Sequence, residues 1–117
     1  MIREWKFYDY DIISSELSQL PAAESAKLAS LMHHYRTVGN QNPAPAQIDD
    51  YGDGIKRLRH IKSAYQGRIL FSVGERSAGY EKLIVLTVYK KEGMTVPNSV
   101  LQRAIKRKKQ FDEMENK

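Results

Sequence analysis

The chain has 117 residues, no cysteine and a formal net charge of +5. A length of this order fits one domain that buries roughly two-thirds of its unfolded surface. The lack of cysteine excludes disulfides and thiolate metal sites, and the apolar runs fall short of the roughly 20 residues of a membrane span. The first residues, MIREWKFYDYD, carry acids and lack the apolar run of a signal peptide. We therefore expect a soluble, cytoplasmic single domain over residues 1–117, with a frayed tail over 112–117.

The charge is unevenly distributed along the chain. Residues 1–54 contain 4 Lys or Arg against 8 Asp or Glu, a net of −4. Residues 55–117 contain 15 Lys or Arg against 6 Asp or Glu, a net of +9. This asymmetry indicates a polyanionic partner, with nucleic acid as the first candidate. The alternative is a basic surface that is simply solvated.

The first part of the chain predicts a strand followed by two helices. Residues 3–10 combine aromatic residues with alternating charge, which is typical of a strand. Residues 12–20 predict a short helix, with Asp11 or Ser14 as its cap. Helix formers and apolar residues at helical spacing then predict a second helix, which should stop at Gly39.

The rest of the chain predicts a connection, a sheet and a last helix. Residues 39–54 are rich in Gly, Asn, Asp and Pro and predict an irregular, exposed segment. Residues 55–73 contain β formers, 74–79 predict a polar turn, and the apolar run over 80–89 predicts a strand buried on both faces. A helix with one apolar stripe should cover residues 97–111. The order predicts an α+β fold with helices on one side of a mainly antiparallel, twisted sheet.

The sequence lacks the common catalytic motifs: HExxH, a Cys–His cluster, a P-loop and GxSxG. His33 and His34 are adjacent on a predicted helix, so their rings point about 100° apart and cannot share a metal ion from one face. His60 lies between cations on a predicted strand and is a candidate acid or base, with a plain surface histidine as the alternative. A calcium loop needs a regular ligand spacing, which is absent from the three aspartates of the connection, Asp49, Asp50 and Asp53.

A set of cations in the second half is the main candidate for chemistry. It comprises Lys56, Arg57, Arg59, Lys62, Arg68, Lys90 and Lys91, with Tyr65, Tyr80 and Tyr89 between them. If Ile55, Leu58 and Ile61 face the core, several of these cations share the opposite surface. Arginine binds phosphate oxygens with its fork, lysine acts as a point charge, and tyrosine stacks on unpaired bases. Such a set binds a nucleic-acid backbone, or it also stabilises the transition state of RNA self-cleavage by the 2′-OH. The residues alone leave both alternatives open.

Two segments resemble a known family. Residues 84–111, IVLTVYKKEGMTVPNSVLQRAIKRKKQF, are similar to the end of RelE/ParE-superfamily toxins, nearest their phage-derived, HigB-like branch. The shared features are an apolar strand, a Lys-Lys pair, a Thr-x-Pro-like turn and a basic helix. Residues 55–72, IKRLRHIKSAYQGRILFS, resemble the basic strand and aromatic-x-x-Arg strand that precede them. The resemblance implies a RelE-like fold: an N-terminal strand and helical hairpin packed on a mainly antiparallel twisted sheet, then a C-terminal helix.

The resemblance also implies a function. It implies the toxin of a type II toxin–antitoxin system, an endoribonuclease that cleaves mRNA without a metal or other cofactor, often on the ribosome, and a helix-turn-helix antitoxin as partner. By position, the functional cations would be Arg57, Arg59, Arg68, Lys90 and Lys91. Arg68 would contact the scissile phosphate, and Tyr89 takes the place of an aromatic residue that often precedes the lysine pair. Since no imidazole stands beside it, Tyr89, His60 or a lysine would transfer the proton.

Further RNA contacts are expected from cations outside this set and from the last helix: Lys56, Lys62, Arg103, Lys106 and Arg107. A second hypothesis is a non-catalytic nucleic-acid- or protein-binding module on the same fold, for example a ParE-like gyrase inhibitor or a phage-derived regulatory protein. The cleavage specificity, the dependence on the ribosome and the oligomeric state, a homodimer included, are left open.

Overall fold

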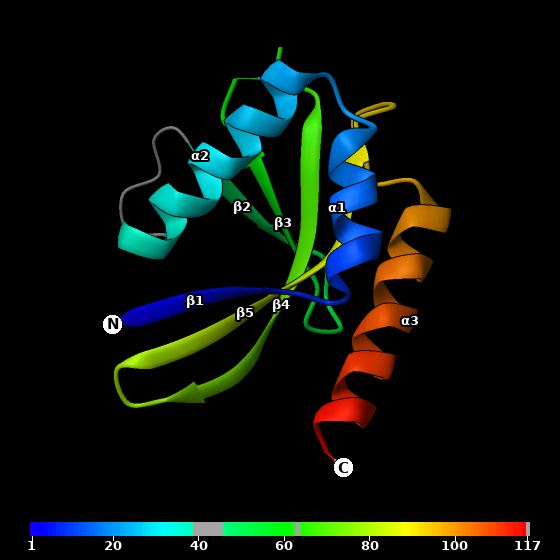
Figure 1. The fold of residues 1–117 in the computed structure, drawn as a ribbon. Coiled ribbons are helices and arrows are strands. Elements are labelled where there is room, and N and C mark those ends of the chain that lie inside the picture. Colours follow the sequence, from blue (N-terminus) through cyan, green and yellow to red (C-terminus); the bar gives the residue numbers. More distant parts are fainter. Residues whose placement is uncertain (39–45, 63, 117) are drawn as a thin grey trace.

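The computed structural model describes residues 1–38, 46–62 and 64–116, which form five strands and three helices. In chain order these are β1 (Ile2–Phe7), α1 (Tyr10–Ser18), α2 (Ala22–Val38), β2 (Ala46–Asp50), β3 (Lys56–His60), β4 (Gly67–Ser77), β5 (Tyr80–Lys90) and α3 (Asn98–Glu115) (Figure 1). The predicted α+β class is confirmed. None of these helices combines the length and apolarity that crossing a membrane would require.

The five strands form one sheet in the order β1-β5-β4-β3-β2. β1 runs parallel to β5, and all other neighbours are antiparallel. β4 and β5, with 11 residues each, form the centre of the sheet and are joined by a tight turn at Gly79, where φ is +78° and glycine is favoured. β1 pairs only with residues 80–85 of β5. The second half of β5 therefore lies at an edge of the sheet.

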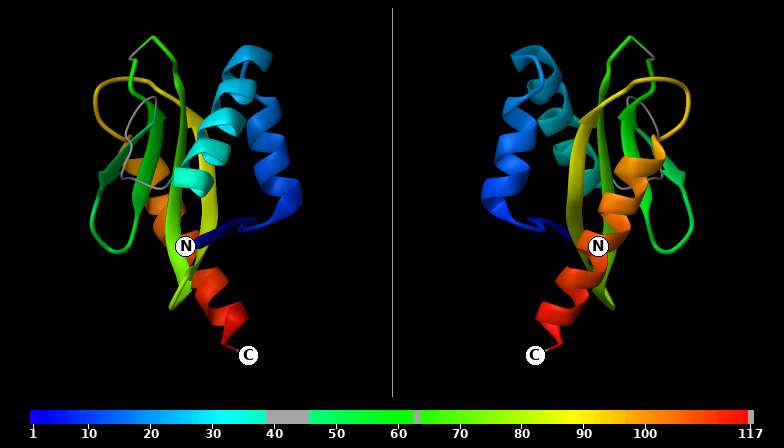
Figure 2. Two further views of the ribbon diagram at one scale, coloured as in Figure 1. Left: turned by 90° about the vertical axis from the view of Figure 1, so that its left-hand side faces the viewer. Right: turned by 90° about the vertical axis from the view of Figure 1, so that its right-hand side faces the viewer.

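Helices cover both faces of this sheet. α1 and α2 pack on one face, where Leu31 belongs to a core cluster with Phe71 of β4. α3 packs on the other face, where Ala104 and Phe111 join a second cluster with Ile84 of β5. Two side views show the sheet between the α1–α2 pair and α3 (Figure 2). The prediction that the helices lie on one side is therefore wrong for α3, because an apolar stripe does not tell which face a helix covers.

A polar network closes the free edge of β5. Glu16 of α1 accepts hydrogen bonds from the Val88 amide at 2.9 Å and from the Thr87 hydroxyl at 3.0 Å. Arg107 of α3 donates to the other oxygen of Glu16 at 2.8 Å and to the Leu86 carbonyl at 3.0 Å. The side chains of Glu16 and Arg107 are only 14% and 15% exposed. Because an open edge invites pairing with other chains, this network both joins α1 to α3 and protects the strand.

Two segments predicted as irregular are strands. Residues 46–50 lie in the predicted connection but form β2, which pairs with β3 through five residues. Residues 74–77 were predicted as a turn, yet they extend β4 because Ser77 pairs with Tyr80. The predicted stop at Gly39 and the rest of the connection up to residue 45 lie outside the described residues.

Two helix boundaries also differ from the prediction. α1 starts earlier than expected and is capped by Asp9, whose carboxylate accepts from the Ile12 amide at 3.0 Å. α3 continues to Glu115, so the expected frayed tail is helical as far as this residue. The Glu115 carboxylate accepts from Lys6 at 3.2 Å and from Lys82 at 3.4 Å. These contacts anchor the last turn of the helix to the sheet.

Candidate nucleic-acid interface

β3 places its cations on two faces of the sheet. Leu58 is fully buried in the core beneath α1 and α2, and side chains alternate along a strand. Lys56 and His60 therefore point to the face of α1 and α2, whereas Arg57 and Arg59 point to the face of α3. The condition that Ile55, Leu58 and Ile61 all face one core is not met, since Ile55 belongs to the α3 core and Ile61 is 48% exposed.

Arg57 and Arg59 converge on Asp49 of β2. The register pairs Asp49 with Arg57. One oxygen, Asp49 Oδ2, accepts from Nε and Nη2 of Arg57 at 3.0 and 2.9 Å and from Nε of Arg59 at 3.1 Å. The pKa of Asp49 lies below its usual value because the hydrogen bonds and charges of both arginines outweigh the effect of burial. The Tyr51 ring lies 5.2 Å from the Arg57 guanidinium carbon. Together these contacts fix both guanidinium groups in place.

Arg68 lies beside this pair and is almost completely buried. The β3–β4 register pairs Leu58 with Ile69, so one further step brings Arg68 next to Arg59. Arg68 Nη1 donates to the carbonyls of Tyr65 at 2.7 Å and Gly67 at 3.0 Å, while its buried Nε makes no hydrogen bond. Burial, followed by repulsion from Arg57 and Arg59, lowers the pKa of Arg68 from its usual value. Three guanidinium groups are thus held close together on the α3 face.

Tyr89 of β5 lies beside Arg68 of the neighbouring strand β4. The two residues are paired in the β4–β5 register, and Tyr89 is 8% exposed. Its hydroxyl is buried and has no partner at full hydrogen-bond geometry, although the Arg57 guanidinium lies close enough to act on its pKa. Burial raises the pKa of Tyr89, and the neighbouring Arg57 opposes this effect only in part. The Tyr89 side chain is therefore a neutral hydroxyl near pH 7, which has a proton to donate to a ligand.

His60 lies on the opposite face of the sheet from Arg57, Arg68 and Tyr89. Its Nδ1 accepts from the Lys62 amide at 2.9 Å, and its ring lies 4.4 Å from the Tyr65 ring. Burial, with the charges of Lys27 and Lys62, lowers its pKa. These contacts give His60 a structural role in the turn that leads from β3 into β4. A role of His60 in proton transfer stays a prediction. Its position on the face away from Arg68 and Tyr89 does not support this role.

The lysine pair at the end of β5 is divided between the two faces. Lys90 follows Val88 of the α1–α2 core by two residues and lines a cavity of about 400 Å³ between α1, β5 and the start of α3. Lys91 follows Tyr89 by two residues, and its amide donates to the Gln66 carbonyl at 2.7 Å. By strand alternation Lys91 belongs to the face of Tyr89 and Arg68. Only one lysine of the predicted pair thus shares a face with the arginines.

The remaining predicted contacts have different surroundings. Arg103 donates to the Thr87 hydroxyl at 2.9 and 3.1 Å, and with Arg107 it belongs to the network that closes the β5 edge. Lys56 lies 3.6 Å from the Asp50 carboxylate. Among the described residues of the second half, six cations form no ion pair: Lys62, Arg68, Lys90, Lys91, Lys106 and Lys109. The first four lie at the end of the sheet where β3 leads into β4 and β5 ends.

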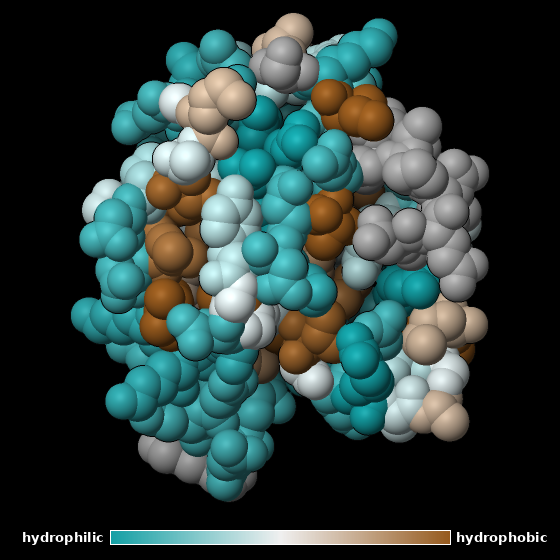
Figure 3. Space-filling model, turned by 180° about the vertical axis from the view of Figure 1, so that it is seen from behind, coloured by the Kyte–Doolittle hydropathy of each residue, from teal (hydrophilic) through white to brown (hydrophobic). Residues whose placement is uncertain are grey.

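The side of the molecule opposite to α1 and α2 has a mixed surface. Hydrophobic areas there are interrupted by strongly hydrophilic side chains (Figure 3). Within residues 1–38, 46–62 and 64–116, no three His, Asp or Glu side chains gather as metal ligands would.

Two residues that contact Arg57 were missed in the sequence, namely Asp49 and Tyr51. Asp49 was interpreted as a turn former and Tyr51 was not considered, because residues 46–50 were not expected to form a strand. The short separation in sequence between Asp49 and β3 could have identified Asp49. A short turn at residues 51–55 would place its carboxylate beside Arg57. Asp53 and Gly54, both with positive φ, form that turn.

Comparisons with known proteins identify one related family. Residues 15–109 match the sequence model of the family described as "Phage derived protein Gp49-like". No curated protein matches the chain significantly. The matched region starts within α1 and contains α2, the strands β2 to β5 and most of α3. It includes Arg57, Arg59, Arg68 and Tyr89.

Proposed function

The chain belongs to the Gp49-like family of phage-derived proteins, part of the RelE/ParE-like toxin superfamily, and we propose that it is a HigB-like toxin that cleaves mRNA. In this proposal the cluster of Arg57, Arg59, Arg68 and Tyr89 binds the phosphate at which the RNA is cut. The family membership and the basic cluster are two independent observations that support the proposal.

The observation that carries it is a pair of buried polar groups without partners. Arg68 and Tyr89 are paired in the register of β4 and β5, and Arg68 Nε and the Tyr89 hydroxyl are both buried without a hydrogen bond of full geometry. Leaving such groups unsatisfied costs roughly 1–3 kcal/mol each, so they call for a ligand or an ordered water. Both are donors, and Arg57 and Arg59 lie beside them. An anion, such as a phosphate oxygen, is the partner that suits this set.

These residues suit cleavage by the RNA itself. The ribose 2′-oxygen attacks the phosphorus, the bond to the 5′-oxygen breaks, and a 2′,3′-cyclic phosphate forms. Arg68, with Arg57 and Arg59, stabilises the negative charge that develops on the phosphoryl oxygens. Tyr89, kept neutral by its raised pKa, donates a proton to the leaving 5′-oxygen. Lys91, on the same face, adds positive charge beside the phosphate, and a water molecule accepts the proton of the 2′-OH.

The partners are part of the same proposal. A toxin of this type works in the cytoplasm, on mRNA that is free or bound to the ribosome, and is neutralised by a helix-turn-helix antitoxin. Lys62, Lys90 and Lys106, which form no ion pair in the described part of the chain, would contact the RNA backbone beyond the scissile phosphate.

The test is cleavage of mRNA by the purified chain, with and without ribosomes, in the presence of EDTA. We expect specific cleavage that Arg68→Ala reduces at least about 100-fold, the usual effect of losing one donor to a developing oxyanion. Arg76→Ala is the matched control, because Arg76 lies on the same strand, is 63% exposed and is far from Tyr89. Thermal unfolding of each variant verifies that it is folded.

Two results would contradict the proposal. Intact mRNA together with tight, salt-sensitive binding would indicate a non-catalytic nucleic-acid-binding module. DNA damage on expression, with mRNA untouched, would indicate a gyrase inhibitor of the ParE type.

A further inference from the structure

One carboxylate of α2 holds the backbone at the start of β4. Glu24 lies in the first turn of α2, and its Oε1 accepts hydrogen bonds from the amides of Gln66 and Gly67, both at 2.9 Å. A Cβ atom at Gly67 would lie only 3.0 Å from Leu28 Cδ1 of the same helix, which leaves little room for a side chain at this position. The hydrogen bonds and the close packing therefore fix residues 66 and 67 against α2.

The carbonyl groups on the other side of these two peptide planes hold parts of the candidate site. A peptide group is planar and almost always trans, so its N–H and C=O point in opposite directions. The plane that contains the Gln66 amide also contains the Tyr65 carbonyl, which accepts from Arg68 Nη1 at 2.7 Å. The next plane contains the Gln66 carbonyl, which accepts from the Lys91 amide at 2.7 Å. Glu24 is thus linked through rigid planes to the Arg68 guanidinium group and to the residue that follows β5.

This anchoring uses only Nη1 of the Arg68 guanidinium group. Nη1 also donates to the Gly67 carbonyl at 3.0 Å, whereas Nε is buried without a hydrogen bond. Nη2 makes no hydrogen bond within the described part of the chain either. Nε and Nη2 lie along one edge of the guanidinium plane, and such an edge binds two oxygens of a phosphate side by side. The carbonyls thus hold Arg68 by Nη1 and leave this edge for a ligand.

We propose that Glu24 is a positioning residue for Arg68 and orients its Nε–Nη2 edge toward the phosphate at which the RNA is cut. Glu24 does not touch this ligand, because it belongs to the helix pair on the other face of the sheet. An arginine side chain has many rotamers, and holding it in one of them before the ligand binds removes an entropic cost from the transition state. The inference rests on the proposed function for the identity of the ligand, whereas the link from Glu24 to Arg68 is independent of it.

Three substitutions separate the hydrogen bonds of Glu24 from its charge. Glu24→Gln keeps an oxygen that accepts from both amides, Glu24→Asp keeps the charge on a shorter side chain, and Glu24→Ala removes both. The kcat of RNA cleavage should fall about tenfold or more in the Ala and Asp variants, because a small misplacement of a catalytic group is costly, and less than about threefold in the Gln variant. KM should change less than about twofold in all three variants, since many other cations bind the RNA backbone.

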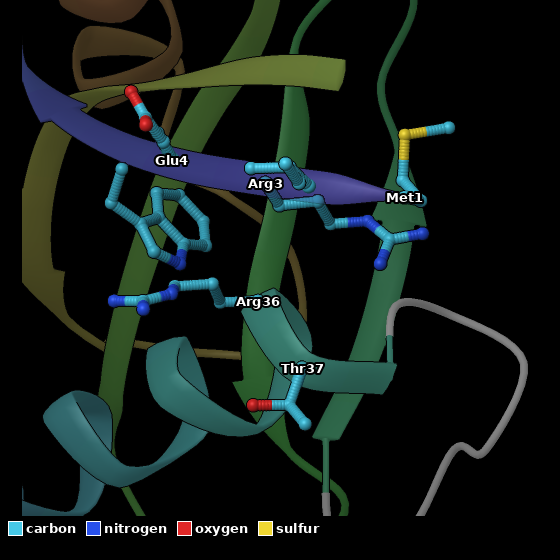
Figure 4. A pocket seen from close by; sticks show the side chains of 7 residues that line it. Met1, Arg3, Glu4, Arg36 and Thr37 are labelled. Atoms are coloured by element: carbon cyan, nitrogen blue, oxygen red, sulfur yellow. The ribbon is translucent and has the colours of Figure 1, made fainter. Parts of the chain in front are cut away.

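A double substitution distinguishes positioning from a general loss of stability. Because Glu24 acts through Arg68, Glu24→Ala should reduce kcat no further in a protein that already carries Arg68→Ala, whereas independent effects would multiply. Glu4→Ala is the matched control and should leave kcat unchanged. Glu4 is an exposed carboxylate of β1 that lines, with Arg36, a cavity beside the last turn of α2, at the opposite end of this helix from Glu24 (Figure 4). Thermal unfolding verifies that each variant is folded.

A measurement without RNA decides on the same link if the chain cleaves no RNA. The Arg68 Nε–H group, identified in nitrogen–proton NMR spectra by its absence from Arg68→Ala, should shift saturably with inorganic phosphate. Glu24→Ala should weaken this binding about threefold or more, and Glu24→Gln should not. Four results would overturn the inference: a signal that does not respond to phosphate, a Glu24→Ala variant that matches the wild type, equal losses in the Gln and Ala variants, or multiplied losses of kcat in the double variant. Absence of cleavage by the wild type, with the phosphate response and its loss in Glu24→Ala intact, would contradict the proposed function alone.

Discussion

The substitution Asp49→Asn should destabilise the fold and at the same time strengthen RNA binding. Asp49 Oδ2 accepts three hydrogen bonds from Arg57 and Arg59, and the Asp49 side chain is 24% exposed. Asparagine retains an oxygen that accepts from these donors but lacks the charge. The substitution therefore leaves both arginines in place with one negative charge fewer beside them.

The magnitude follows from the number of contacts. The asparagine oxygen keeps charged donors but loses the charge attraction to two arginines, and at about 1 kcal/mol for each partly exposed pair the loss is about 2 kcal/mol. For a domain of this size, that lowers the melting temperature by about 8 °C. The unneutralised charge should steepen the salt dependence of single-stranded RNA binding by about 0.7 in the slope of log K against log salt concentration.

The assay combines thermal unfolding with fluorescence anisotropy of a 2′-O-methyl RNA, which binds but cannot be cleaved by its own 2′-oxygen. Asp50→Asn is the matched control: it removes the same charge from the next residue, which is 69% exposed and pairs with Lys56 on the other face. The control should change neither property measurably. Weaker RNA binding by Asp49→Asn, in a folded protein, would refute the view that Asp49 competes with phosphate for the two arginines.

Three further predictions concern single residues. Glu16→Ala should cost roughly 3–5 kcal/mol in urea unfolding, because it leaves the Arg107 charge and the Val88 amide buried without a partner, whereas removal of the exposed Glu115 carboxylate should have little effect. Tyr89→Phe removes a buried hydroxyl that has no partner, so stability should stay equal or increase, while cleavage falls about 100-fold or more; equal cleavage would exclude Tyr89 as the acid. The lowered pKa of His60 means that the unfolded chain binds this proton first as the pH falls below 6.5. Stability should therefore decrease with falling pH in this range, and His60→Gln should lack that part of the decrease in unfolding experiments at several pH values.

The strongest sequence patterns predicted the centre of the fold. The apolar run of 80–89 is β5, which is buried from residue 83 to residue 89 because helices cover both of its faces. The start of the last helix at Pro97 was also predicted, since proline suits the first turn. Both features depend on local sequence, and there the prediction is correct.

The features that were missed depend on pairing between distant segments. Residues 46–50 contain Ala, Gln and two Asp, which are poor β formers, and they become a strand only because β3 offers a partner. Ile55 and Leu58 are three apart, a spacing interpreted as one inward face, but they lie in different cores on either side of the sheet. Tertiary contacts thus decided both the second strand and the faces of the cations.

The fold shows which of the basic residues behind the charge asymmetry could bind a polyanionic partner. Much of the basic charge of the second half is used internally: Arg57 and Arg59 share Asp49, and Arg107 closes the β5 edge with Glu16. Net charge alone therefore overstates what is available to a ligand. What is available is concentrated, because four of the cations that form no ion pair in the described part of the chain lie at one end of the sheet: Lys62, Arg68, Lys90 and Lys91. That end also holds the unpartnered Tyr89 hydroxyl, so the argument for a phosphate ligand depends on this location and not on the total charge.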